Sequence, residues 1–167
     1  GVTMAVLEAL KEAILSERRA AAFYETAAKN AGDAGVRSVF STMAEEERGH
    51  ARLLAKQWAS AVQGGNFSAP SDEPMQPGAQ DAIVSHAIRN GLLAAGFEAG
   101  AIAAAMALEE RAIKFYGARA EVATDPNEKA LYCWLATWEK GHLEFLAKMD
   151  DQLRETVWHD QNFWPLD

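Results

Sequence analysis

Carboxylate and imidazole side chains recur in this sequence at a spacing that suits metal binding. The pattern Glu-x-x-His occurs twice, each time 30 residues after a further glutamate: Glu17, Glu47, His50, Glu109, Glu139 and His142. Residues three apart on a helix lie on one face, about 5–6 Å apart at Cβ, so such a Glu/His pair can bind one metal ion or bracket two. One copy alone would be weak evidence, whereas two copies with the same upstream partner indicate a built site.

The two copies belong to an internal repeat. When the chain is shifted by 92 residues, its halves match at Glu17 and Glu109, at two Phe-Tyr pairs that end in Tyr24 and Tyr116, and at both Glu-x-x-His motifs. The repeat also distinguishes Glu109 from its neighbour Glu110, since only Glu109 matches Glu17. We therefore expect two similar helical hairpins, each with a glutamate on its first helix and Glu-x-x-His on its second.

The hydrophobic pattern predicts the helices that must position these side chains. Apolar residues recur every three or four positions, as in helices that bury one face in a bundle. The pattern covers four ranges: 4–30, about 34–63, about 92–123 and 126–156. A glutamate stands near the middle of each apolar stripe, where an apolar residue is expected. The prediction is an all-α, pseudo-symmetric four-helix bundle.

The segments outside these helices fit one domain over residues 1–167. Residues 64–80 contain three of the five prolines, and with a short helical piece at 81–90 they form a crossover over about 64–90. A connection of this length is explained if it runs along a helix bundle. The C-terminal tail, about 157–167, is expected to fold back over the bundle.

Composition narrows the functional classes. A formal net charge of −8 argues against nucleic-acid binding and against an anionic membrane surface, since both favour a basic patch. The single cysteine, Cys133, excludes a disulfide framework or a cysteine-ligated cluster within this chain. No signal segment opens the sequence and no apolar run is suited to span a membrane, so we expect a cytoplasmic protein.

Four buried carboxylates would repel one another and lose hydration unless cations were bound between them. Two divalent cations neutralise four carboxylates, and two neutral histidines complete the ligand set. Oxygen and imidazole ligands suit iron, manganese or zinc, and affinity alone does not choose among these metals. The residues therefore predict a dinuclear metal centre, and the choice among iron, manganese and zinc stays open at this point.

The order of these motifs resembles that of the rubrerythrin-type members of the ferritin-like di-iron carboxylate superfamily. The resemblance implies a ferritin-like bundle over roughly residues 4–156 and ligand roles for the six residues above, with the glutamates of the Glu-x-x-His motifs as bridges. It also implies that Tyr24 and Tyr116 hydrogen-bond to ligand carboxylates. The implied activity is an oxidoreductase that reduces peroxide or activates O2.

Two departures from the family pattern bear on function. Full rubrerythrins carry a rubredoxin-like four-cysteine iron domain that this chain lacks, so electrons are expected from a separate donor. They also carry an additional carboxylate where this chain has Ala112, which puts their redox-linked ligand exchange in question. A ferroxidase or iron-storage protein, a manganese catalase-like enzyme, and a metal-binding protein without turnover stay open as alternatives.

Other residues carry smaller expectations. Glu45 and Glu46 are read as a solvated face, Cys133 as a packing residue, and Glu98 as an inward residue too far from Glu109 to share its metals. We expect His86 and His159 at the surface, and Gly49 and Gly141 at a close helix approach or beside room for a small oxidant. Small residues on one face of the third helix suggest a helix–helix contact between two subunits, so a homodimer is predicted: Ala99, Gly100, Ala103 and Ala104.

Overall fold

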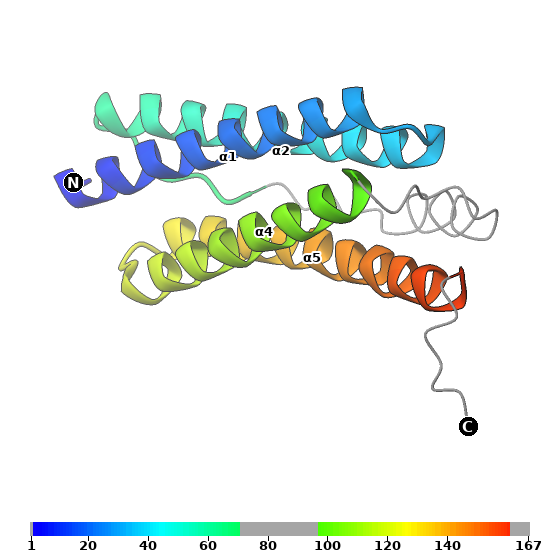
Figure 1. The fold of residues 1–167 in the computed structure, drawn as a ribbon. Helices are drawn as coiled ribbons and strands as arrows, with labels where there is room; N and C mark the ends of the chain where they lie inside the picture. The colour runs from blue at the N-terminus through cyan, green and yellow to red at the C-terminus, as the bar shows by residue number, and fades with distance from the viewer. Residues whose placement is uncertain (1, 71–96, 161–167) are drawn as a thin grey trace.

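The computed structural model describes residues 2–70 and 97–160, and within these ranges every regular element is a helix. The helices are α1 (Met4–Asn30), α2 (Ala34–Val62), α4 (Phe97–Val122) and α5 (Pro126–Asp160). Figure 1 shows them as two antiparallel hairpins, α1 with α2 and α4 with α5, lying one above the other. The predicted all-α bundle of two hairpins is confirmed.

The predicted helix bounds agree with the observed ones to within one residue, except at the end of α5 and at the expected start of the third helix at about 92, which lies outside the described residues. This helix continues to Asp160, four residues beyond the expected position 156, and the rest of the expected tail, 161–167, lies outside the described residues. No glycine or proline interrupts the chain before Pro165, which explains the continuation. The expected helical piece at 81–90 and most of the crossover lie outside the described residues.

Side-chain caps define where helices begin and so make the hairpin turns short. The carboxylate of Asp33 accepts a 2.8 Å hydrogen bond from the backbone N–H of Val36 at the start of α2. Asp125 accepts a 3.0 Å bond from the N–H of Glu128 in the same way, next to a proline at the first position of α5. Only three residues separate the two helices in each hairpin, so each pair packs antiparallel.

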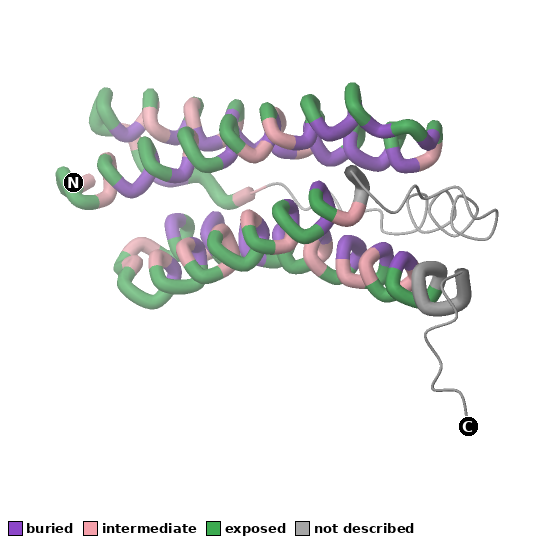
Figure 2. The backbone as a smooth tube through the Cα atoms, in the orientation of Figure 1, coloured by how far each residue is buried: buried purple, intermediate pink, exposed green. Residues whose placement is uncertain are grey.

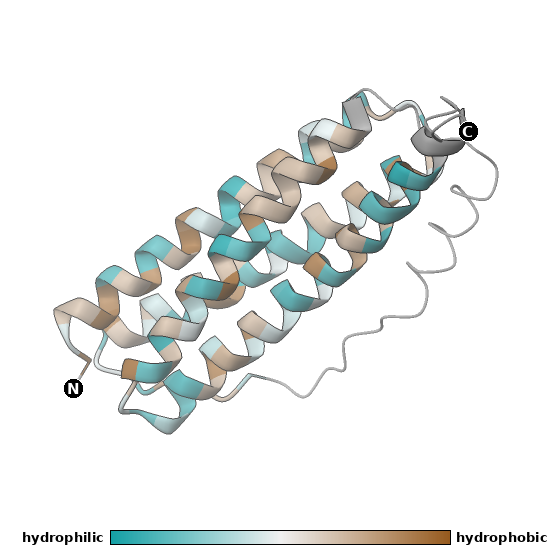
Figure 3. Cartoon of the chain, turned by 60° about the horizontal axis from the view of Figure 1, so that its bottom comes forward, coloured by the Kyte–Doolittle hydropathy of each residue, from teal (hydrophilic) through white to brown (hydrophobic). Residues whose placement is uncertain are grey.

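The core consists of two apolar clusters, one toward each end of the bundle. One contains Phe40, Met43, Ile102, Leu146 and Met149, and the other Leu10, Leu54, Leu131 and Leu135. Buried positions lie along the inner sides of both hairpins in Figure 2, and Figure 3 shows hydrophobic and hydrophilic residues interleaved along each helix. On α1, Glu17 falls between Leu10 of one cluster and Tyr24 of the other. The glutamate therefore lies where the apolar core is interrupted.

Several lesser expectations can be compared with the structure. Cys133 is exposed, so its prediction as a packing residue is wrong: it follows buried Tyr132 and points to the outer side of α5. Gly100, Ala103 and Ala104 form an exposed strip on α4, and the homodimer stays a prediction. The side chains of Glu98, His86 and His159 lie outside what the structure describes. Among the described helices, none combines the length and apolar character needed to cross a membrane.

Candidate metal centre

All four helices contribute to one buried polar cluster at mid-bundle. α1 and α4 each supply one glutamate, and α2 and α5 each supply a Glu-x-x-His pair. Each of the six residues is at most 4% exposed: Glu17, Glu47, His50, Glu109, Glu139 and His142. The structure thus brings together all six residues that the repeat singled out. Glu110, which the repeat rejected, is exposed on the opposite side of α4.

The six side chains form two overlapping groups. Glu17 and His50 make one group with Glu47 and Glu139, whereas Glu109 and His142 make the other with the same two shared glutamates. In each group one ligand atom per residue lies within 4.8 Å of all the others. The two imidazoles face each other with ring centroids 6.5 Å apart. This arrangement is consistent with a dinuclear metal site in which Glu47 and Glu139 lie between the ions.

Unsatisfied polar atoms point into this cluster. Both carboxylate oxygens of Glu47, Oε1 of Glu139, and Nδ1 of each histidine are buried without a hydrogen-bond partner. Nδ1 of His142 lies 2.9 Å from Oε1 of Glu47, but the geometry there is not that of a hydrogen bond. Buried polar atoms are nearly always satisfied in proteins. Atoms that converge without partners fit the binding of cations between them.

The pKa shifts of the buried glutamates also indicate a site for cations. Burial, together with the neighbouring Glu17, raises the pKa of Glu47 from its ordinary value of 4.5 to about 7. Burial also raises the pKa of Glu109, helped by Glu139. Burial and Glu47 act to raise the pKa of Glu139 too, but the close approach of Glu109 and of the two histidines outweighs them and lowers it. Without metal, the cluster therefore retains protons that two divalent cations would replace.

The histidines are affected in the opposite sense by their carboxylate neighbours. Burial alone would lower the pKa of His50, but Glu139, Glu17 and Glu47 raise it well above its usual range. His142 behaves in the same way, with Glu109 as its leading carboxylate partner. In the metal-free cluster, protonated imidazoles thus partly balance the negative charge of the carboxylates. The same carboxylates would bind metal cations in their place.

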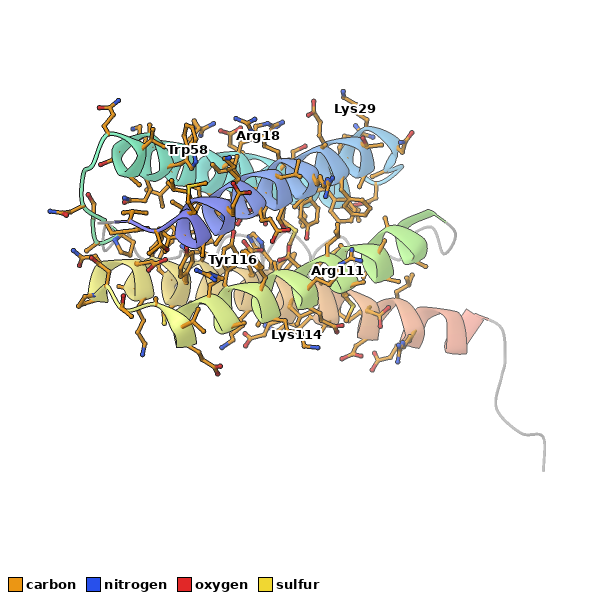
Figure 4. The ribbon with its side chains drawn as sticks, turned by 90° about the vertical axis from the view of Figure 1, so that its left-hand side faces the viewer. Arg18, Lys29, Trp58, Arg111, Lys114 and Tyr116 are labelled. Carbon is orange, nitrogen blue, oxygen red and sulfur yellow. The ribbon has the colours of Figure 1, made fainter. Side chains whose placement is uncertain are left out.

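Tyr24 and Tyr116 hydrogen-bond to cluster carboxylates, but not on their own helix. Tyr24 of α1 donates to Oε1 of Glu109 at 2.5 Å, and Tyr116 of α4 donates to Oε1 of Glu17 at 2.6 Å. Each tyrosine is seven residues, or about 10 Å along the axis, from the glutamate of its own helix. Packing of α1 against α4 therefore brings each hydroxyl to the other hairpin. Figure 4 shows Tyr116 in the interior and Lys29 and Lys114 at the surface.

Burial raises the pKa of both tyrosines well above the usual value, and the adjacent carboxylates raise it further. The hydroxyls of Tyr24 and Tyr116 consequently stay protonated and act as donors. Each fixes a carboxylate that faces a histidine: Oε2 of Glu17 lies 3.6 Å from Nδ1 of His50, and Oε1 of Glu109 lies 3.3 Å from Nδ1 of His142. Ala112, which replaces the additional family carboxylate, is partly buried against the apolar core and offers no ligand atom.

Glu46 has a contact that the sequence reasoning missed. Its Oε2 lies 2.6 Å from Nε2 of His142, and its side chain is only 24% exposed, so its prediction as a solvated residue is wrong. Glu45, by contrast, is exposed and pairs with Arg48 and Arg52. Glu46 comes just before Glu47, one step around α2, and this turns it toward α5. The internal repeat marks Glu46 as a position where the two halves differ, because its counterpart in the second half is Trp138.

The surroundings of His50 and Gly49 also differ from expectation. Trp134 and Trp138 pack edge-on against the His50 ring, with centroids 5.5 and 5.3 Å away. No role for these tryptophans was predicted. A Cβ added at Gly49 would meet only Nη2 of Arg52, at 3.8 Å. The proposed close helix approach at Gly49 is therefore wrong.

Comparison with known proteins places the chain in a family. Searches of curated proteins and of solved structures gave no significant match. A family model described as Rubrerythrin matches residues 8–150, a stretch that includes all six cluster residues and both tyrosines. The match covers most of the chain, including the two Glu/His groups that share Glu47 and Glu139. The chain belongs to the rubrerythrin family.

Proposed function

We propose that this protein is a di-iron oxidoreductase that reduces peroxide with electrons from a separate donor. The observation that carries the proposal is the pair of buried Glu/His groups that share Glu47 and Glu139. Two ferrous ions held there would supply the two electrons that, with two protons, convert hydrogen peroxide into two molecules of water. A separate donor would have to supply two electrons for each peroxide reduced.

The chain's own residues prepare the site for this reaction. Four helices bury the cluster, so bulk water is excluded from its ligand atoms. Glu17 and Glu109 each accept a tyrosine hydrogen bond, which fixes their carboxylates before metal arrives. The four carboxylates match the charge of two divalent cations, and each histidine presents Nδ1 to the cluster.

Variants can test the metal assignment first. Glu47→Ala should abolish binding of both ions because Glu47 belongs to both groups, whereas Glu109→Ala should abolish binding only at the His142 group. Glu110→Ala is the matched control, since Glu110 is adjacent to Glu109 but exposed. Metal analysis of the iron-loaded proteins gives the stoichiometry. Two ions per chain in Glu47→Ala would show that these residues are not the ligands.

Stopped-flow absorption then tests the reaction. The reduced, iron-loaded protein is mixed anaerobically with hydrogen peroxide and, separately, with O2. Peroxide reduction predicts rapid oxidation of the iron by peroxide, repeated turnover when a reductant is added, and slower oxidation by O2. Oxidation by O2 at least as fast as by peroxide would contradict the proposal. So would a shell-forming oligomer in light scattering that takes up iron far beyond two ions per chain, since that is the behaviour of a storage protein.

A further inference from the structure

We propose that Glu46 is a positioning residue that makes the His142 half of the centre the tighter metal position, so that the two ions bind in order. This inference rests on the dinuclear centre of the proposed function but not on its reaction. It concerns a difference between the two halves that the six cluster residues themselves do not show.

The contact of Glu46 with His142 determines which ring nitrogen is available to a metal. Oε2 of Glu46 lies 2.6 Å from Nε2 of His142, a distance typical of a charge-assisted hydrogen bond. The N–H at Nε2 donates to this carboxylate, and Nδ1 of the same ring points into the cluster. There Nδ1 lies 2.9 Å from Glu47, 3.3 Å from Glu109 and 3.5 Å from Glu139. Glu46 thus holds the tautomer and ring orientation that metal binding needs.

The corresponding place behind His50 is occupied by an indole. Trp138 is the repeat counterpart of Glu46, and its ring lies edge-on to His50 with centroids 5.3 Å apart. An indole offers a single N–H donor and no acceptor atom, so it cannot accept a hydrogen bond from an imidazole N–H. Nε1 of Trp138 indeed has no hydrogen-bond partner. Trp138 packs against His50 but cannot fix its tautomer.

The same difference places unequal charge on the two metal positions. Each position has one glutamate of its own and the two shared ones. The His142 position has in addition the Glu46 carboxylate, hydrogen-bonded to the far side of its imidazole, which increases the basicity of the ligand nitrogen. Loss of such an outer partner typically lowers metal affinity 10–100-fold. We therefore expect the His142 position to fill first.

The test is a titration of the metal-free protein with Co(II), followed by its visible absorption and by calorimetry. The wild-type protein should bind two ions in two resolved steps. Glu46→Gln keeps the size and one acceptor oxygen but removes the charge, and should weaken the tighter step about 10-fold. Glu46→Ala removes the acceptor as well and should weaken that step toward 100-fold. The weaker step should be unchanged in both variants.

Two control variants and one localisation experiment complete the design. Glu45→Gln changes the adjacent, exposed carboxylate and should leave both steps as in the wild type. Trp134→Phe keeps an aromatic ring beside His50 and should also leave the tighter step unchanged. Anomalous diffraction from crystals of the wild-type protein with one equivalent of Co(II) should place that ion beside His142, and Glu46→Ala should lose this preference.

The outcomes separate this inference from the proposed function. If the wild-type protein binds fewer than two ions, the dinuclear centre itself is wrong. If it binds two ions but Glu46→Gln leaves both steps unchanged, or weakens both equally, then the role of Glu46 is wrong and the centre stands. Failure of peroxide turnover, with two ordered binding steps intact, would overturn the proposed reaction alone.

Discussion

Removing metal should make the stability of this protein fall as the pH rises, and Glu47 gives the clearest measure of this effect. Its carboxyl is fully buried, and its pKa is raised from 4.5 to about 7. A carboxyl with a raised folded pKa holds its proton more tightly in the folded state than in the unfolded state. Its contribution to stability is therefore present below pH 4.5 and is lost as the pH rises through 7.

The magnitude follows from that shift. At 1.36 kcal/mol per pKa unit, the loss from Glu47 between pH 5 and pH 8 is about 2–3 kcal/mol. For a chain of this size, 1 kcal/mol corresponds to about 2–4 °C in Tm, so a decrease of about 5–10 °C is expected. The raised pKa values of His50 and His142 act in the same direction, since above about pH 6.5 the unfolded state loses a proton that each buried imidazole still holds.

The assay is thermal unfolding of chelator-treated protein at several pH values, compared with Glu47→Gln. The amide of this variant does not titrate, so its Tm should decline by about 5–10 °C less than that of the wild type over the same range. Zinc, which has no redox chemistry, should remove the decline in the wild type because cations take the place of the protons. The reasoning would be refuted if the Tm of the metal-free wild type were constant or rising from pH 5 to pH 8, or if Glu47→Gln followed it in parallel.

Three further sets of substitutions have defined outcomes. Tyr24→Phe should keep the fold but lower metal affinity at the His142 position about 10–100-fold in titrations, because the Tyr24 hydroxyl bonds Glu109. Tyr116→Phe should have the same effect at the His50 position, because its hydroxyl bonds Glu17. Loss of affinity at the opposite position in either variant would contradict this pairing. Gly49→Ala should raise the Tm by about 2–4 °C, since a Cβ there meets nothing closer than 3.8 Å and alanine favours helix by about 1 kcal/mol; a lower Tm would indicate a steric conflict. Asp33→Ala should lower stability by about 1 kcal/mol in urea unfolding, with Asp33→Asn near the wild type, because the cap of α2 is lost only in the first.

The cluster could be predicted from sequence because its pattern is local and repeated. Glu-x-x-His fixes two side chains on one helix face whatever surrounds the helix. The match between Glu17 and Glu109 then identified the remaining ligands without any knowledge of packing. The partners of Tyr24 and Tyr116 could not be found in this way. They depend on how far α1 is displaced along α4, which no spacing within one helix determines.

The error at Glu46 has a related cause. Helical periodicity identifies a single inward stripe, and on α2 that stripe passes through Glu47 and His50. A helix in a bundle meets two neighbours, however, so residues beside the stripe can face the second neighbour. Glu46 contacts His142 of α5 in this manner, while Glu45, one step further round, is exposed. Residues at the margin of a stripe are thus assigned by packing and not by pattern.

The two halves of the internal repeat therefore match among the ligand residues but differ in the residues that surround them. Inside the cluster, replacing one carboxylate would leave two divalent cations with an unbalanced charge in a buried space, so both halves keep the same ligands. Outside the cluster, Glu46 is partly exposed and Trp138 is half-buried. Neither residue is one of the four carboxylates whose charge balances the two cations. The two halves can differ there without loss of the centre. It is at this outer level that a nearly symmetric cage acquires one histidine fixed by a carboxylate and another packed against an indole.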